Sequence, residues 1–300
     1  TGSLALDGAS LPFNTITGNT VGVQFDTSGN SVVGYRIEGN QTGIVVDDAG
    51  GNTIGGINSA KTNTISGNTT AGIELRGSNS DTTVIQRNVI GLNDALSGPN
   101  ANGIGILVNG PTGILLDGTD PSQLNTISGN IVGVQFDSGS NQITAYPIIG
   151  HQTGIKVHAG NVTIGGNATT DRNTISGSST AGIELASSAA SSTVVRGNWI
   201  GLDNAGTGAN GNAVGILNSG ASGWTLDETN PNTISGNTVG VSLTTNTNLI
   251  YGNKFGFDSA SGTVANDTDI LISGGSANSV GGTIPNSIQG STSASVRITG

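Results

Sequence analysis

The stretch Asn63-Thr-Ile-Ser-Gly-Asn-Thr-Thr-Ala-Gly-Ile-Glu-Leu75 holds the two short apolar segments that decide the fold. Its opening phrase, or a close variant, begins at residues 14, 63, 125, 173, 232 and 286, so self-similarity runs through the chain. Alternate residues of a strand face opposite sides, so Ile73 and Leu75 are expected to point into a core while Glu74 faces water. Repetition on this scale predicts a solenoid in which each turn packs on the next.

A third short segment follows the first two, as in Thr83-Val-Ile85, and the pattern then restarts in a weaker form at Asn88-Val-Ile-Gly91. Each repeat therefore contains two coils of three strands. We count 11 first strands, of which Tyr35-Arg-Ile37 and Tyr146-Pro-Ile148 are the least regular. The sequence predicts an all-β parallel β-helix with three short strands per coil and about 11 coils, forming a single domain over residues 1–300.

The turns between strands are rich in Gly and Asn, which accept left-handed backbone conformations at low cost. The Asn residues that precede the first strands recur from coil to coil. One interpretation is a ladder in which each side-chain amide bonds the next, as in stacked cross-β structures. The other is that each amide bonds only its own turn.

The alternation of Asn52-Thr-Ile-Gly-Gly56, Asn63-Thr-Ile-Ser-Gly-Asn68, Gly72-Ile-Glu-Leu75 and Asn88-Val-Ile-Gly-Leu-Asn93 resembles the bacterial right-handed parallel β-helix repeat proteins. The resemblance covers essentially the whole chain. It implies a right-handed coil, and it implies a very large secreted or cell-surface protein, a class in which most members have no assigned activity.

Composition limits the partners of the chain. The formal net charge is −10, from 9 basic and 19 acidic residues, so a nucleic acid backbone would be repelled. No apolar run approaches the ~20 residues of a membrane span, so membrane insertion is not expected. The chain contains no Cys, which excludes disulfides and thiolate metal sites.

The search for chemistry gives no catalytic residue and no cofactor site. A glycosidase needs two carboxylates roughly 5–10 Å apart, and Asp47-Asp48, the only adjacent pair of aspartates, is interpreted as a solvated turn. Acidic residues in two matching turns are weak calcium candidates against a simple hydrogen-bonded turn: Asp117, Asp120, Asp227 and Glu228. Trp199 and Trp224 are possible stacking platforms for sugars.

Three longer loops leave the coil between first and second strands and are expected to form one ridge. They span residues 92–103, 202–212 and 257–269. Loops on a rigid scaffold are where binding usually sits, although solenoids also tolerate neutral insertions. The candidate binding residues on this ridge are Asn93, Asp94, Asn102, Asp203, Asn204, Asn210, Asp258, Asp267 and Asp269.

We therefore expect a non-enzymatic structural or adhesive scaffold, secreted or at the cell surface, that is a segment of a large surface protein or the subunit of a fibre, with glycans as possible ligands. The alternative is a polysaccharide-active enzyme, either a lyase or a glycosidase, or a carbohydrate-binding module. The chain opens on a third-strand pattern and closes on the second-strand segment Ser295-Val-Arg-Ile298. This arrangement predicts head-to-tail continuation with more β-helix, from the same chain or from another copy.

Overall fold

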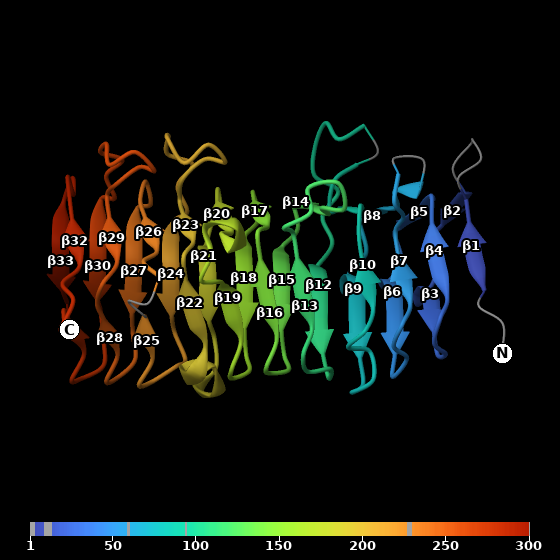
Figure 1. Ribbon diagram of the computed structural model, residues 1–300, viewed down its shortest axis with the longest axis horizontal. Helices are drawn as coiled ribbons and strands as arrows, with labels where there is room; N and C mark the ends of the chain where they lie inside the picture. The colour runs from blue at the N-terminus through green and yellow to red at the C-terminus, as the bar shows by residue number, and fades with distance from the viewer. Residues whose placement is uncertain (1–3, 9–13, 59–60, 94, 227–229, 300) are drawn as a thin grey trace. The chain divides into compact units, whose positions relative to one another are not determined.

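A computed structural model of the chain describes residues 4–8, 14–58, 61–93, 95–226 and 230–299. These residues fall into two compact units, Thr1–Gly139 and Ser140–Gly300. Each unit is a parallel β-helix with three short strands per coil, as the sequence predicts, and it is right-handed, as the resemblance implies. Unit 1 contains five first strands and unit 2 contains six, which confirms the expected 11 coils. Successive coils lie side by side within each unit (Figure 1).

The strands of unit 1 occupy three positions in the coil, and its first strands and its second strands each form a continuous stack in chain order. The first strands are β2 (Asn14–Ile16), β5 (Tyr35–Glu38), β8 (Thr64–Ser66), β11 (Val89–Ile90) and β14 (Thr126–Ser128). The second strands are β3 (Val21–Phe25), β6 (Thr42–Asp47), β9 (Ala71–Arg76), β12 (Ile104–Asn109) and β15 (Val132–Phe136). The third strands are β1 (Ala5–Asp7), β4 (Ser31–Val33), β7 (Thr53–Ile54), β10 (Val84–Ile85) and β13 (Leu115–Asp117).

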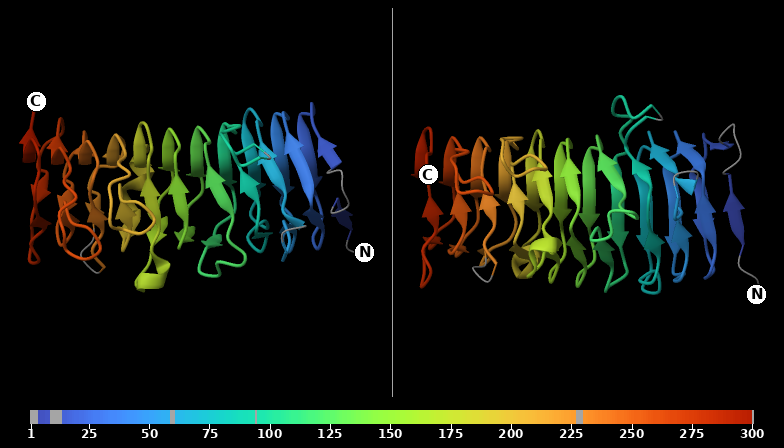
Figure 2. Two further views of the ribbon diagram at one scale, coloured as in Figure 1. Left: turned by 90° about the horizontal axis from the view of Figure 1, so that it is seen from above. Right: turned by 45° about the horizontal axis from the view of Figure 1, so that its top comes forward.

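Unit 2 repeats this arrangement, and Figure 2 shows its parallel stacks from two further sides. Its first strands are β17 (Pro147–Ile149), β20 (Thr174–Ser176), β23 (Trp199–Ile200), β26 (Thr233–Ile234), β29 (Lys254–Phe255) and β32 (Ser287–Ile288). Its second strands are β18 (Thr153–Val157), β21 (Ala181–Leu185), β24 (Val214–Asn218), β27 (Val239–Leu243), β30 (Thr268–Ile272) and β33 (Ala294–Ile298). Its third strands are β16 (Gln142–Thr144), β19 (Thr163–Gly165), β22 (Val194–Arg196), β25 (Thr225–Leu226), β28 (Leu249–Ile250) and β31 (Ser279–Val280). Two short 3-10 helices, η2 (Thr169–Asp171) and η3 (Ser188–Ser192), lie in its turns.

The core of each coil is a narrow column of aliphatic side chains in register. In the first-strand stack of unit 2, Ile175 pairs with Ile200 and Ile200 with Ile234, and all three are fully buried. The second-strand stack of unit 1 aligns Ile44, Ile73 and Ile106 in the same way. Each side chain is therefore covered by the coils on either side of it, which is why one coil cannot bury its core alone.

Asparagine side chains form ladders inside the turns, which confirms the first interpretation of the repeated Asn residues. Asn198 Nδ2 donates to Asn232 Oδ1 (3.0 Å) and to the main-chain oxygen of Ile164 (2.9 Å). Asn198 Oδ1 in turn accepts from Nδ2 of Asn173 (2.9 Å) and from its main-chain N–H (3.3 Å). Both the donors and the acceptor of a buried amide are thus satisfied by adjacent coils.

The same pattern recurs at more than one corner of the coil. Ladders of linked amides in the described residues are Asn63–Asn88–Asn125, Asn40–Asn68–Asn102–Asn130, Asn212–Asn237–Asn266 and Asn218–Asn248–Asn278.

Candidate functional site

The three longer loops fold as small closed hairpins. Each is pinched at its base by an isolated antiparallel bridge, at Leu92↔Pro99, Leu202↔Ala209 and Phe257↔Thr263. The side-chain oxygen of the second residue then accepts the main-chain N–H four residues later, as from Thr207 to Asp203 (3.0 Å). Asn93 and Asp258 do the same with Ser97 (3.0 Å) and Gly262 (2.6 Å). These loops are therefore built structures, each held by its own polar side chain.

The hydrogen bond to Asp203 also changes the pKa of its carboxyl group. The N–H of Thr207 stabilises the charged carboxylate, and this bond holds the pKa of Asp203 below its usual range. Asn93, Asp203 and Asp258 thus use part of their bonding capacity to shape the loop that carries them.

In unit 2 the two long loops are joined to each other and to the sheet beneath. The N–H of Ser259 donates to the main-chain oxygen of Gly206 (2.8 Å). Gly206 lies so close to Trp199 that a Cβ there would sit 2.5 Å from Cη2 of the indole. The guanidinium of Arg172 lies over the ring of Trp199, 4.2 Å from its centroid. Trp199 therefore anchors the loop 202–212 to the first-strand sheet, and its ring is already in contact with protein groups.

The remaining candidate binding residues occupy different environments. Asn102 is buried in a ladder, and Asn210 donates to Ser176 Oγ (2.9 Å). Asn204 and Asp267 are exposed on unit 2, and Oδ1 of Asp267 accepts from Oγ1 of Thr292 (2.7 Å). Asp94 lies outside the described residues.

Asp269 is fully buried inside the coil and does not project from the ridge. It stands where the preceding coils carry an inward-facing glycine, such as Gly240, whose Cβ would meet the next coil. Its Oδ1 accepts from Asn266 Nδ2 (2.8 Å), and its Oδ2 accepts from Ser291 Oγ. Burial raises the pKa of Asp269, although the hydrogen bonds oppose that shift.

Asp269→Asn is expected to increase stability at neutral pH. Because the folded pKa is raised above the ordinary value of about 3.9, stability falls as pH rises from that value through the raised pKa. The neutral amide avoids this loss and keeps the bond from Asn266. Urea unfolding of both proteins between pH 4 and pH 8 checks the prediction, and a variant less stable than the parent at pH 7 would contradict it.

The acidic turn of unit 1 holds its carboxylates with its own groups. Asp117 Oδ1 accepts the N–H of Thr119 (2.8 Å), and Asp120 accepts the N–H (2.9 Å) and the hydroxyl (2.6 Å) of Ser122. The hydroxyl of Ser122 contributes most to lowering the pKa of Asp120. Among the described residues, no group of three or more acidic or histidine side chains is placed to hold a metal ion. Asp227 and Glu228 lie outside the described residues.

Two further predictions about individual side chains can be placed. Asp48 has a left-handed backbone (φ 52°), and its Oδ1 accepts the N–H (3.1 Å) and the Nδ2 (3.0 Å) of Asn79, as a turn residue does. Glu74 does not face water as expected. It is only 5% exposed, because Arg76 covers it and pairs with it at 2.8 Å between Nε and Oε1.

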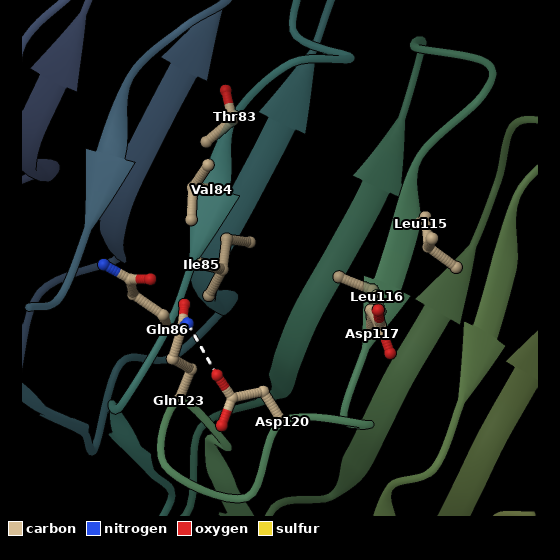
Figure 3. Close-up of a pocket in the computed structure, with 9 residues that line it drawn as sticks. All are labelled: Thr83, Val84, Ile85, Gln86, Leu115, Leu116, Asp117, Asp120 and Gln123. Atoms are coloured by element: carbon tan, nitrogen blue, oxygen red, sulfur yellow. Dashed lines mark hydrogen bonds between the residues drawn. The ribbon is translucent and has the colours of Figure 1, made fainter. Parts of the chain in front are cut away.

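A cleft that the sequence analysis missed opens between β10 and β13 in unit 1 (Figure 3). Its volume is about 260 Å³, and one wall is the segment from Thr83 to Gln86. The other wall and one end are formed by Leu115, Leu116, Asp117, Asp120 and Gln123. The signal in the sequence is a longer turn: seven residues (77–83) precede β10, whereas five (48–52) precede β7 and five (110–114) precede β13.

No described helix combines the length and the hydropathy that crossing a membrane requires. No family model, no curated protein and no solved structure matches the chain.

Proposed function

We propose that this chain is a structural scaffold that holds a set of rigid loops in fixed positions, as part of a secreted or cell-surface adhesive protein. The observation that carries the proposal is the use of polar side chains. The buried amides are engaged in ladders, and the loop carboxylates bind the N–H groups of their own loops. A side chain that is committed to structure in this way stabilises a display surface, because it fixes the loops before any ligand arrives.

The bacterial right-handed β-helix repeat proteins are the class that this proposal points to. The parallel β-helix, the repeated Asn-Thr-Ile-Ser-Gly phrase and the acidic balance of the chain support it. In such a protein the coils of one array continue into those of the next, so head-to-tail partners of the same fold belong to the proposal.

The adhesive surface is assigned to the loops 202–212 and 257–269 of unit 2. The bond between Ser259 and Gly206 makes them one continuous surface, and Trp199 fixes it to the sheet. Asn204 and Asp267 are two of its exposed polar groups. Amide and carboxylate side chains on a firm backbone suit the hydroxyl groups of a glycan.

A glycan array combined with a polysaccharide degradation assay tests the function. We expect binding to one or more glycans, weakened by N204A or D267A, with no release of reducing ends from pectin or alginate. The matched control is S222A, an exposed residue at another corner of unit 2. Measurable cleavage that disappears on mutation of Asp47 or Asp48 would overturn the proposal in favour of an enzyme.

A further inference from the structure

The third-strand stack is interrupted in each unit while the other two stacks continue. In unit 1, β7 pairs with β10, but β10 and β13 belong to separate sheets. In unit 2 the same separation occurs between β22 and β25. The two interruptions fall at equivalent points of the repeat, since Thr83 and Thr193 are 110 residues apart, as are Leu115 and Thr225.

On both sides of the unit 1 cleft, main-chain groups lack the hydrogen bonds that an intact third-strand stack would give them. Where the stack is intact, the N–H groups of Val84 and Gln86 donate back to the preceding coil at 2.9 Å. Leu115 and Asp117 hold the corresponding positions one coil later. Because β10 and β13 are not paired, these two N–H groups face the cleft without that partner.

Strand β10 also presents main-chain groups to the cleft. The oxygen of Ile85 accepts from Asn125 Nδ2 (2.8 Å), which closes one site. Within the described residues, the oxygen of Thr83 and the N–H of Ile85 have no hydrogen-bond partner. The hydroxyl of Thr83 is also buried without a partner. Unpaired polar groups at a buried or half-buried position are costly, so the cleft is predisposed to accept a ligand that pairs them.

Unit 2 has a cleft of similar volume at the equivalent place, about 250 Å³ and lined by Thr193, Val194 and Thr225, but one of its main-chain oxygens is already bonded. There the indole Nε1 of Trp224 donates to the main-chain oxygen of Thr193 (2.9 Å), and Trp224 is fully buried. The equivalent residue in unit 1 is Ile114, which has no donor. The carbonyl that Trp224 satisfies in unit 2 is therefore the one that remains free, on Thr83, in unit 1.

Side chains add an apolar middle and an acidic end to the cleft. Val84 and Leu115 are 47% and 54% exposed, which is unusual for aliphatic residues of this chain. Asp117 and Asp120 lie toward the carboxyl ends of the walls, where Figure 3 shows Asp117 beside Leu116 and Asp120 beside Gln123. The volume of about 260 Å³ is slightly below the roughly 300–1,000 Å³ of small-ligand pockets, so the occupant is short.

We propose that the cleft between β10 and β13 binds a short extended peptide as an inserted parallel strand, with an apolar pair followed by a basic residue. Strand addition uses main-chain hydrogen bonds for affinity and alternate side chains for specificity. The main-chain groups of Thr83, Ile85, Leu115 and Asp117 that face the cleft supply the hydrogen bonds. The exposed aliphatic side chains and the two carboxylates supply the specificity.

The test uses the full chain labelled with ¹⁵N and the probe peptide acetyl-Thr-Val-Ile-Lys-amide. We expect saturable shifts of the amide resonances of Ile85, Leu115 and Asp117, together with slower hydrogen exchange at these sites. The amides of Val194 and Thr225, in the unit 2 cleft, should not respond. A peptide N-methylated at its Ile should bind at least tenfold more weakly, because it lacks a donor.

Two variants complete the test. I114W places an indole where unit 2 has Trp224 and should weaken peptide binding at least tenfold. L115K is the second variant, for use if I114W does not fold. It changes an exposed residue and places a positive charge beside the Lys of the peptide, so it should also weaken peptide binding. T225K is the matched control in unit 2 and should leave binding unchanged.

The proposal is overturned if the amide resonances do not move at peptide concentrations up to ~10 mM, beyond the millimolar affinities of weak complexes. It is also overturned if the N-methylated peptide binds as well as the parent. Shifts of the same resonances with pectin or alginate oligosaccharides, in the absence of any response to the peptide, would instead assign the cleft to a glycan.

Discussion

Gly201→Ala is expected to unfold unit 2 or to lower its free energy of unfolding by more than about 4 kcal/mol, among the largest effects known for single substitutions. Gly201 has a φ of +93°, and a Cβ there would lie 2.2 Å from the oxygen of Ser235 and 2.3 Å from Oδ1 of Asn237. Both atoms belong to the next coil, and the main-chain oxygen cannot move without breaking the stack. Urea unfolding followed by far-ultraviolet circular dichroism measures the loss.

Gly223→Ala separates the two causes of this effect. Gly223 also has a positive φ, +73°, but the nearest atom to its Cβ would be Thr247 Oγ1 at 3.8 Å. This variant should lose only the roughly 1–2 kcal/mol of a left-handed residue with a side chain. Equal losses in G201A and G223A would show that backbone conformation alone, and not the approach of the next coil, requires glycine at position 201.

Asn198→Ala is expected to lower the free energy of unfolding by about 2–6 kcal/mol. The substitution leaves the N–H of Asn173 and the oxygen of Ile164 buried without partners, and each such group costs about 1–3 kcal/mol. It also interrupts the ladder between Asn173 and Asn232, so bonds on both sides lose their mutual polarisation. The shift of the urea midpoint measures the effect.

The control for this prediction is Asn204→Ala, in the loop that follows the same strand. Asn204 is exposed, so its loss should change stability by no more than about 0.5 kcal/mol. If both variants were equally stable, the ladder would contribute no more to the fold than an asparagine on the surface.

Much of the fold could be predicted from the sequence because each coil repeats the same short sequence pattern. Ile65 and Ile90 recur at a fixed distance after an Asn, and the structure pairs them in register. The two least regular first strands, at Tyr35 and Tyr146, also form, as β5 and β17. Packing on neighbouring coils therefore compensates for a weak local pattern.

The parts that escaped prediction depend on contacts between coils that no single repeat shows. Asp269 lies inside because the next coil carries Ser291 where other coils have a ladder asparagine, and the serine hydroxyl bonds it. Glu74 is covered because Arg76 two residues later folds back over it. The cleft depends on two extra residues in the turn before β10 and on Ile114 in place of a tryptophan.

The ladders give the stack a chemical direction. In every linked pair of ladder amides, Nδ2 of one Asn donates to Oδ1 of the Asn in the following coil, as from Asn68 to Asn102 and from Asn232 to Asn253. In both of these pairs the main-chain N–H of the first Asn donates to the same oxygen, which fixes the orientation of the accepting amide. The side-chain amide dipoles of a ladder therefore point in the same direction along the stack, and they add.

One face of any coil consequently offers amide donors, and the opposite face offers amide acceptors. Two donor faces, or two acceptor faces, cannot bond each other. A two-fold symmetric contact between such faces is therefore disfavoured, whereas a polar arrangement in which every coil points the same way extends without a mismatch. Assemblies built from this coil are expected to grow as one-way filaments, with ends that differ in chemistry and therefore in growth rate.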